Sequence, residues 1–276
     1  MTAHRWFDLD GKVALITGGS AGIGRGIALA FAEAGATVVI AARRPGPLVQ
    51  TTEELRRFGG PALGIAADVR SADSVAELTS RVIGAYGRVD ILVNNAGGSY
   101  GDEFRRAPLV DLTEEDFAGC FSENLLGHFL VSKSVAPIMF GQGKGVIVNI
   151  SSWVGRESGP PAANMGFYPV SKAAFTKLNS VMATEWAPTI RVNAITPGFI
   201  ATPRVSAIMR SVSAEALRAN IALGRFGHPD DVAGAAVFLA SDAASWITGI
   251  ALDVTGGVAA PGAAPASVRR DELQTV

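Results

Sequence analysis

Short runs of apolar and β-branched residues recur along the chain, and stretches with helical spacing separate them. The apolar runs lie at Val13 to Thr17, Thr37 to Ala42, Leu63 to Ala67, Ile91 to Asn94, Val146 to Ile150, Val192 to Ile195 and Ile250 to Val254. Short runs of this composition are typical of buried strands. Between the first two runs, apolar residues from Ile23 to Ala34 recur at intervals of three or four, which predicts a helix that ends near Gly35.

The alternation of strands and helices continues through the sequence. Helical spacing recurs at Ser74 to Tyr86, Thr113 to Phe140 and Tyr168 to Trp186, and Pro229 with the two acids after it marks another helix start. Asp116, three residues after Thr113, predicts a capping box at that helix start. Strands joined by helical crossovers run parallel and are covered on both faces, so we predict an α/β fold: a doubly wound parallel sheet of about seven strands with helices on both faces.

The chain of 276 residues fits one domain of this kind, because no internal repeat or linker divides it. We expect the domain to span residues 1–258 and an alanine-rich tail to span residues 259–276. Residues 198–227 follow a strand and show no clean strand period, so we expect a substrate loop there.

Charge and composition exclude several classes of partner. Lys and Arg total 24 and Asp and Glu total 25, so no global field attracts nucleic acid or an anionic membrane. No apolar run reaches the length of a membrane span, and the three histidines lack metal-ligand spacing, so we expect no membrane segment and no metal site. Cys120 is the single cysteine, which fits a reducing compartment, and we expect a cytoplasmic protein.

Glycine is in excess, with 32 residues, and several glycines lie where the first strand meets the first helix. The segment Thr17 to Gly24 reads T-G-x-x-x-G-x-G and contains the candidate cofactor residues Gly18, Ser20, Gly22, Ile23 and Gly24. Glycines there let the backbone approach a pyrophosphate while the helix N-terminus offers free N–H groups to its charge. An ordinary strand-to-helix turn is the competing interpretation, but the position after the first strand favours a nucleotide site.

Tyr168 and Lys172 are four residues apart, so on a helix they share one face. A phenol has an unperturbed pKa of about 10, and a nearby ammonium favours its anion, which suits acid–base chemistry near neutral pH. A core tyrosine beside a solvated lysine is the alternative for this pair alone. Together with the glycine turn, the catalytic interpretation is favoured.

These motifs, with Asn94-Asn95-Ala96-Gly97 after the fourth strand and Pro197-Gly198 after the sixth, resemble those of the classical short-chain dehydrogenases/reductases. The resemblance covers roughly residues 8 to 258. It implies a single-domain Rossmann-type fold and hydride transfer between a nicotinamide and a small-molecule ketone or aldehyde, or the corresponding alcohol. It also implies a homo-oligomer, tetrameric or dimeric, for which the apolar segment Trp246 to Val258 would suit a subunit contact.

The resemblance implies four catalytic residues. Tyr168 would act as general acid or base, and Lys172 would favour the ionised form of that phenol and hold the nicotinamide ribose. Ser152, in the pattern S-S-x-x-G, would bind the substrate oxygen. The 16 positions from Ser152 to Tyr168 exceed the usual family spacing, so we expect an enlarged loop at residues 155–167 and keep Ser151 and Ser158 as alternatives. Asn124 would anchor a water in a proton relay to the lysine, and a tolerated polar helix residue is the competing interpretation.

Further cofactor contacts follow from the same resemblance. Asp68, followed by Val69, would accept from the adenine amino group, although a strand-end turn cap competes with that role. The positions that would line the adenosine and nicotinamide sides are Asn95, Ala96, Gly97, Pro197, Gly198, Ile200 and Thr202.

The end of the second strand decides between the two nicotinamide cofactors. An acid there binds the ribose 2′-OH of NAD and would repel the 2′-phosphate of NADP, but this chain has Ala42 followed by Arg43 and Arg44. Guanidinium groups match a phosphate bidentately, so we predict that NADP(H) is preferred over NAD(H). Two surface arginines without a ligand are the competing interpretation.

An NADP(H)-dependent oxidoreductase is therefore the first hypothesis. An NADP-binding regulator without turnover is a second hypothesis, which the intact tyrosine, lysine and serine set disfavours. An epimerase or dehydratase that recycles its cofactor is a third, which the modest length disfavours.

The substrate class is read from residues in the two segments expected to face the substrate. An apolar or cyclic ketone is suggested by Trp153, Met165, Phe167, Ile200, Ile208 and Met209, whereas Arg156, Arg204 and Arg210 leave an anionic acyl carrier open. Packing within the loops is the competing interpretation for every one of these residues.

Overall fold

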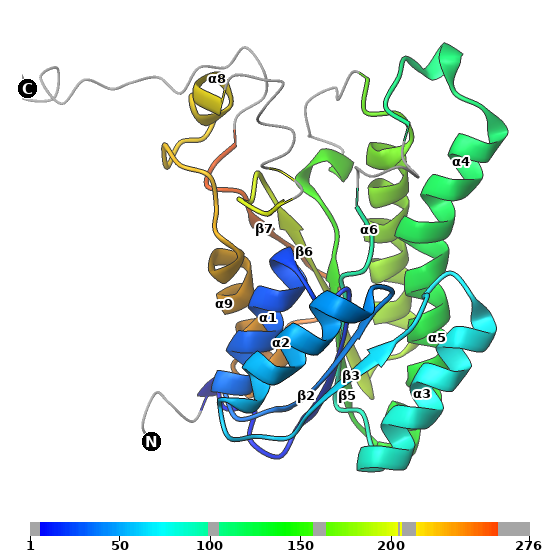
Figure 1. Cartoon of the computed structure of the whole chain (residues 1–276), viewed down its shortest axis with the longest axis vertical. Helices are drawn as coiled ribbons and strands as arrows, with labels where there is room; N and C mark the ends of the chain where they lie inside the picture. Colours follow the sequence, from blue (N-terminus) through cyan, green and yellow to red (C-terminus); the bar gives the residue numbers. More distant parts are fainter. Residues whose placement is uncertain (1–5, 99–104, 157–163, 204, 206–213, 259–276) are drawn as a thin grey trace, which may run out of the picture.

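The computed structural model contains one central sheet with helices packed on both of its faces (Figure 1). It describes residues 6–98, 105–156, 164–203, 205 and 214–258. The sheet has seven strands in the order β3-β2-β1-β4-β5-β6-β7, and every neighbouring pair is parallel. The predicted doubly wound parallel sheet is confirmed.

The strands end close to the predicted boundaries. They are β1 (Val13–Thr17), β2 (Thr37–Ala42), β3 (Ala62–Ala66), β4 (Ile91–Asn94), β5 (Gly145–Ile150), β6 (Ile190–Pro197) and β7 (Ala251–Val254). All five residues of β1 and all four of β4 are buried, as expected for central strands covered on both faces.

The helices form two layers. They are α1 (Gly22–Glu33), α2 (Pro45–Arg56), α3 (Ala72–Tyr86), α4 (Glu114–Phe121), α5 (Gly127–Gln142), α6 (Tyr168–Glu185), α8 (Ala214–Arg218) and α9 (Pro229–Ala240). In Figure 1, α1, α2 and α9 lie on one side of the sheet and α3, α4, α5 and α6 on the other. Two buried apolar clusters correspond to these layers, one centred on Ile27 and Phe31 of α1 and the other on Val131 and Val135 of α5.

Helix α2 has no counterpart among the predicted elements. Its first residues are Pro45, Gly46 and Pro47, which in sequence read as a loop. Proline is nevertheless tolerated in the first turn of a helix, where the backbone N–H groups lack intrahelical partners. Leu48 and Leu55 then bury one side of the helix, so packing determines its conformation.

The helical stretch predicted from Thr113 to Phe140 is interrupted. The predicted capping box between Thr113 and Asp116 is present at the start of α4. A π-helical turn, η3 (Ser122–Leu126), then joins α4 to α5. Such turns alter the register of side chains within a helix and often occur at functional sites.

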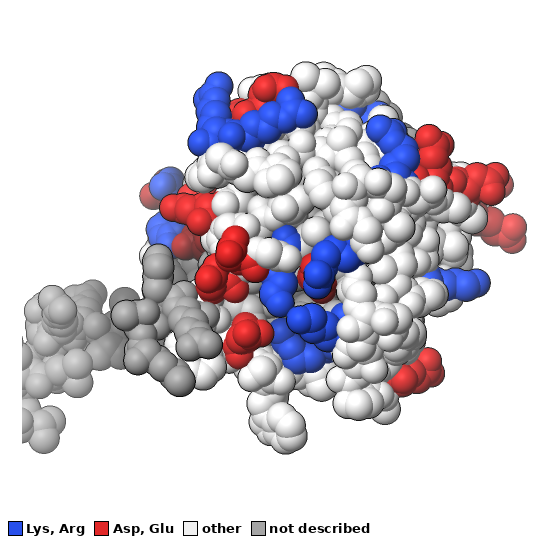
Figure 2. Space-filling view, turned by 90° about the horizontal axis from the view of Figure 1, so that it is seen from below, with Lys and Arg blue, Asp and Glu red and all other residues white. Residues whose placement is uncertain are grey.

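The strand order reverses between β1 and β4, whose carboxyl ends therefore flank the topological switch point. Ligands of open α/β sheets bind in the crevice at such a point. Figure 2 shows the molecule from below, the side opposite the carboxyl ends of the strands. Acidic and basic side chains lie there among broad uncharged areas, and neither charge sign dominates this face.

Candidate active site

The turn after β1 approaches another part of the backbone closely. Gly18 has a φ of +66°, and a Cβ built on it would lie 2.8 Å from Asn95 Nδ2 and 2.9 Å from Ala96 Cα. Asn95 Nδ2 donates to the carbonyl oxygens of Thr17 at 3.0 Å and Gly18 at 3.2 Å. The carboxyl ends of β1 and β4 are thus joined, and only glycine fits at position 18.

The N-terminus of α1 has no capping side chain. Its N-cap residue, Ala21, makes no side-chain hydrogen bond, and the first turn contains no acidic residue. The positive end of the helix dipole and its unpaired N–H groups suit an anionic group such as a pyrophosphate. Ser20 is buried at this turn. In the first turn of the helix, Gly24 is buried and Ile23 lies half-buried beside it.

The segment after β6 reaches the same glycine turn. Pro197 ends β6, Gly198 packs against the backbone of Thr255, and Ile200 is buried. A Cβ on Gly22 would lie 3.3 Å from Thr202 Cγ2. Two predicted cofactor segments, far apart in sequence, therefore meet at the N-terminus of α1, and the close glycine cradle fits a dinucleotide.

Tyr168 and Lys172 lie together at the beginning of α6. Lys172 is 3% exposed, and its Nζ donates to the carbonyl oxygen of Ile150 at 3.1 Å. The same nitrogen lies 5.9 Å from the centre of the Tyr168 ring, and Tyr168 is half-buried. An ammonium is thus fixed between the end of β5 and a partly accessible phenol.

The two serines after β5 differ in their surroundings. Ser151 faces α6, where its Oγ donates to the carbonyl oxygen of Lys172 at 3.1 Å and lies 2.7 Å from Thr176 Oγ1. The Ser152 hydroxyl makes no hydrogen bond to the part of the chain that the structure describes, and the residue is 8% exposed. Ser151 is therefore occupied in holding the helix, which leaves Ser152 as the better-placed hydroxyl donor.

Asn124 lies in η3 and is fully buried. Its Oδ1 accepts the N–H of Gly98 at 3.0 Å, and its Nδ2 donates to the carbonyl oxygens of Gly98 at 3.1 Å and Cys120 at 3.2 Å. Gly97, with a φ of +131°, has room only for hydrogen because a Cβ would lie 2.8 Å from Asn124 Oδ1. The asparagine side chain thus binds the turn after β4.

The arginines predicted to contact the cofactor follow β2. Arg43 and Arg44 are both exposed, and Arg44 is the N-cap residue of α2. Arg43 Nη2 lies 3.4 Å from a carboxylate oxygen of Glu123, a residue of η3 that the sequence analysis did not identify. Arg43 and Glu123 are 80 positions apart in the chain, so no local sequence pattern could have predicted their contact.

Asp68 and Val69 follow β3 on the same side of the crevice. Asp68 is half-buried and accepts hydrogen bonds from the Arg70 guanidinium, with Nη2 to Oδ2 at 2.7 Å. This hydrogen bond, the largest cause, lowers the pKa of the Asp68 carboxyl from its usual value. Val69 is 8% exposed and contacts the start of α5, since a Cβ on Gly127 would meet its Cγ2 at 2.7 Å.

His128, also missed in the sequence analysis, is a buried neutral side chain next to the site. It is 1% exposed and stacks on Phe175 with ring centres 4.2 Å apart. Neither ring nitrogen has a hydrogen-bond partner among the described residues. Burial lowers the pKa of His128 well below its usual value, and the charge of Lys172 lowers it further.

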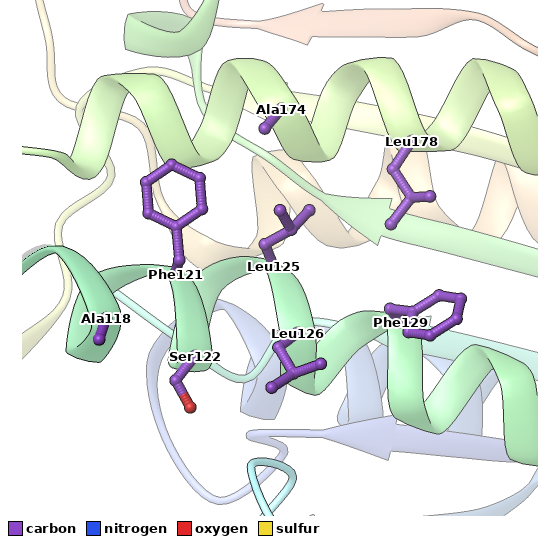
Figure 3. Close-up of a pocket in the computed structure, with 8 residues that line it drawn as sticks. All are labelled: Ala118, Phe121, Ser122, Leu125, Leu126, Phe129, Ala174 and Leu178. Carbon is purple, nitrogen blue, oxygen red and sulfur yellow. The ribbon is translucent and has the colours of Figure 1, made fainter.

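An apolar groove of about 460 Å³ lies between η3, α5 and α6, and none of the site residues described above lines it. In Figure 3, Phe121 and Leu125 point toward α6, and Leu178 points back across the groove. Its lining is almost entirely apolar, so it lacks the polar groups that would orient a reacting substrate.

Parts of both expected substrate loops, residues 155–167 and 198–227, lie outside the described residues. The predicted positions affected are Ser158, Arg204, Ile208, Met209 and Arg210, together with the tail 259–276. Among described residues, no three metal-ligating side chains of His, Cys, Asp or Glu gather into a site. In the same part of the chain, no helix has the length and apolarity needed to cross a membrane.

The glycine cradle and the uncapped helix at the switch point of a doubly wound sheet define a Rossmann-type α/β protein. A family model described as enoyl-(acyl carrier protein) reductase matches residues 18–259. A 3-oxoacyl-(acyl-carrier-protein) reductase FabG from Thermotoga maritima is 40% identical over 251 residues, which cover 91% of this chain and 98% of the relative. A 7alpha-hydroxysteroid dehydrogenase from Escherichia coli K12 is 38% identical over 250 residues, which cover 90% of this chain and 94% of the relative.

A solved structure agrees with these relatives. A 7 alpha-hydroxysteroid dehydrogenase complexed with NADH and 7-oxo glycochenodeoxycholic acid matches with a TM-score of 0.86 at 37% identity, covering 94% of this chain and 98% of that one. The chain belongs to the classical short-chain dehydrogenase/reductase family. It is an oxidoreductase that acts on CH–OH or C=O groups with a nicotinamide cofactor.

Proposed function

We propose that this protein is an NADP(H)-dependent oxidoreductase that interconverts a ketone or aldehyde and the corresponding alcohol. The observation that carries the proposal is the placement of Tyr168 beside the buried Lys172, at the crevice that also contains the glycine turn. A bound nicotinamide supplies or accepts the hydride. The protein has to orient the substrate oxygen and supply or accept the accompanying proton.

Three side chains would share that work. The Tyr168 phenol gives a proton to the oxygen of a ketone or takes one from an alcohol. Lys172, held by the carbonyl oxygen of Ile150, favours the ionised phenol between turnovers. The Ser152 hydroxyl donates a hydrogen bond to the same substrate oxygen and stabilises the negative charge that develops on it.

Asn124 would contribute as a positioning residue. Its amide is engaged with Gly98 and Cys120, so we propose that it holds the turn after β4 in place beside the cofactor. With these bonds made, the Asn124 side chain is not the group that would anchor the predicted relay water near Lys172.

The substrate would be an apolar or cyclic carbonyl compound. Trp153 and Phe199 have ring centres 5.4 Å apart, and Phe226 extends the aromatic cluster from Phe199 at 6.4 Å. Arg156, considered as a site for an anionic carrier, forms an ion pair with Asp253 at 2.8 Å, which offsets its charge. Of the two relatives, the hydroxysteroid dehydrogenase is named for an apolar, cyclic substrate. The 3-oxoacyl-(acyl-carrier-protein) reductase is named for a carrier-bound substrate, which keeps an anionic acyl carrier as the alternative.

We also propose a homo-oligomer in the cytoplasm. The apolar groove between η3, α5 and α6 is flanked by exposed Leu126 and Phe129, which would be covered by a second copy. Trp246, in the C-terminal segment expected to form a contact, is 99% exposed. The single, buried Cys120 supports a reducing compartment.

Arg43→Ala is expected to weaken NADP binding by about 10- to 100-fold, because charge-assisted hydrogen bonds contribute about 1.5–3 kcal/mol. NAD lacks the 2′-phosphate, so its affinity should change much less. Isothermal titration with each cofactor measures both effects, and Arg57→Ala, at the exposed end of α2, is the matched control. Tighter binding of NAD by the unmodified protein, with NADP affinity unchanged in Arg43→Ala, would refute the NADP preference.

A further inference from the structure

An acid lies next to the proposed 2′-phosphate site, although β2 does not supply it. In Rossmann folds that bind NAD, a carboxylate at the end of the second strand accepts a hydrogen bond from the ribose 2′-OH. This chain has Ala42 at the end of β2. The structure instead brings Glu123, from η3, to the guanidinium of Arg43, the residue that follows β2. Its carboxylate oxygen lies 3.4 Å from Arg43 Nη2.

The position of Glu123 is fixed by its neighbours in the chain. The next residue, Asn124, is fully buried and hydrogen-bonded to Gly98. One turn later, Gly127 packs directly against Val69 at the adenosine end of the crevice. The Glu123 side chain itself is 13% exposed, whereas that of Arg43 is 42% exposed. A largely buried carboxylate thus faces a more exposed guanidinium.

Side chains of both charge signs lie around this point. Arg43 faces Glu123 and also acts on Asp68, whose pKa is lowered first by its hydrogen bond with Arg70 and to a smaller extent by the charge of Arg43. Arg44 adds a further positive charge beside Arg43 in the chain. Because the Glu123 carboxylate pairs with the Arg43 guanidinium, the 2′-phosphate of NADP would have to compete with this carboxylate for the arginine. The negative charge of Glu123 would also repel the phosphate.

We infer that Glu123 is a cofactor-specificity residue that opposes Arg43 and limits the preference for NADP over NAD. With NADP, the carboxylate competes with the 2′-phosphate for the guanidinium. With NAD, it can accept a hydrogen bond from the ribose 2′-OH, the role usually filled by an acid at the end of β2. The inference rests on the proposed NADP site.

The test is a set of dissociation constants for NADP and NAD, measured by isothermal titration without substrate. The proteins are the unmodified chain, Glu123→Gln, Arg43→Ala and the double variant, with Glu33→Gln at the exposed end of α1 as a charge-matched control. Glu123→Gln should tighten NADP binding about threefold or more relative to NAD, the size expected for a partly exposed ion pair. The shift should shrink in the Arg43→Ala background, because the two residues act on each other.

An unchanged ratio of NADP to NAD affinity in both Glu123→Gln and Glu123→Ala, or shifts equal to that of Glu33→Gln, would overturn the inference. Glu123→Ala carries the same expectation and serves if the glutamine amide itself binds Arg43 or the first variant folds poorly. Failure of the NADP proposal is distinguishable, because it would appear in the unmodified protein as tighter NAD binding that Arg43→Ala leaves unchanged.

Discussion

Tyr168→Phe is expected to lower kcat by about 10²- to 10⁴-fold, the contribution typical of a positioned general acid or base. The substitution removes the phenol oxygen but keeps a ring 5.9 Å from Lys172 Nζ. Packing at the start of α6 and the cofactor site should therefore be preserved. The measurement is steady-state reduction of the best carbonyl substrate with NADPH, combined with the dissociation constant of the cofactor.

A second tyrosine provides the matched control. Tyr86 ends α3, on a part of the molecule remote from the crevice, and loses the same single oxygen in Tyr86→Phe. We expect its kcat to stay within about twofold of the unmodified protein, as surface or remote changes usually have small effects. Retained turnover in Tyr168→Phe with intact cofactor binding would exclude Tyr168 as the acid or base.

Ser152→Ala is expected to lower kcat by about 10²- to 10³-fold, because it removes a hydrogen-bond donor to the developing charge on the substrate oxygen. Ser151→Ala should have the opposite profile. It removes the bonds from Ser151 to Lys172 and Thr176 on α6, so we expect about 1 kcal/mol of lost stability and nearly unchanged turnover. The readouts are kcat and the free energy of unfolding in denaturant for both variants.

The two serine variants together test which hydroxyl contacts the substrate oxygen. A large loss of kcat in Ser151→Ala with unchanged turnover in Ser152→Ala would transfer the substrate contact to Ser151. Equal losses in both would mean that the segment after β5 acts as one unit and that neither hydroxyl alone binds the substrate.

Much of the fold was predictable because its signals are local. The apolar runs predicted the strands. The helix that contains Tyr168 and Lys172 was also predictable despite Pro169, because proline is tolerated in the first turn of a helix such as α6. The missed helix α2 shows the limit of this approach. Pro45 and Pro47 read as a loop, and only the burial of Leu48 and Leu55 against the sheet makes that segment helical.

The candidate site was predictable where one short segment contains the relevant groups, as in the glycine turn. Contacts between distant segments were not. The approach of Glu123 to Arg43 depends on a π-helical turn that changes the direction of side chains, and nothing in the residues around Asn124 indicated that turn. The different roles of Ser151 and Ser152 likewise depend on how α6 packs against β5.

The most direct test of the proposed activity is a stoichiometric one on the unmodified protein. A panel of apolar and cyclic ketones is incubated with NADPH, and the NADPH oxidised and the alcohol formed are both quantified. We predict one alcohol for each NADPH consumed, with a lower kcat/KM for NADH. Substrate conversion without net NADPH oxidation would instead indicate an epimerase or dehydratase, and NADPH binding without any conversion across the panel would indicate a regulator.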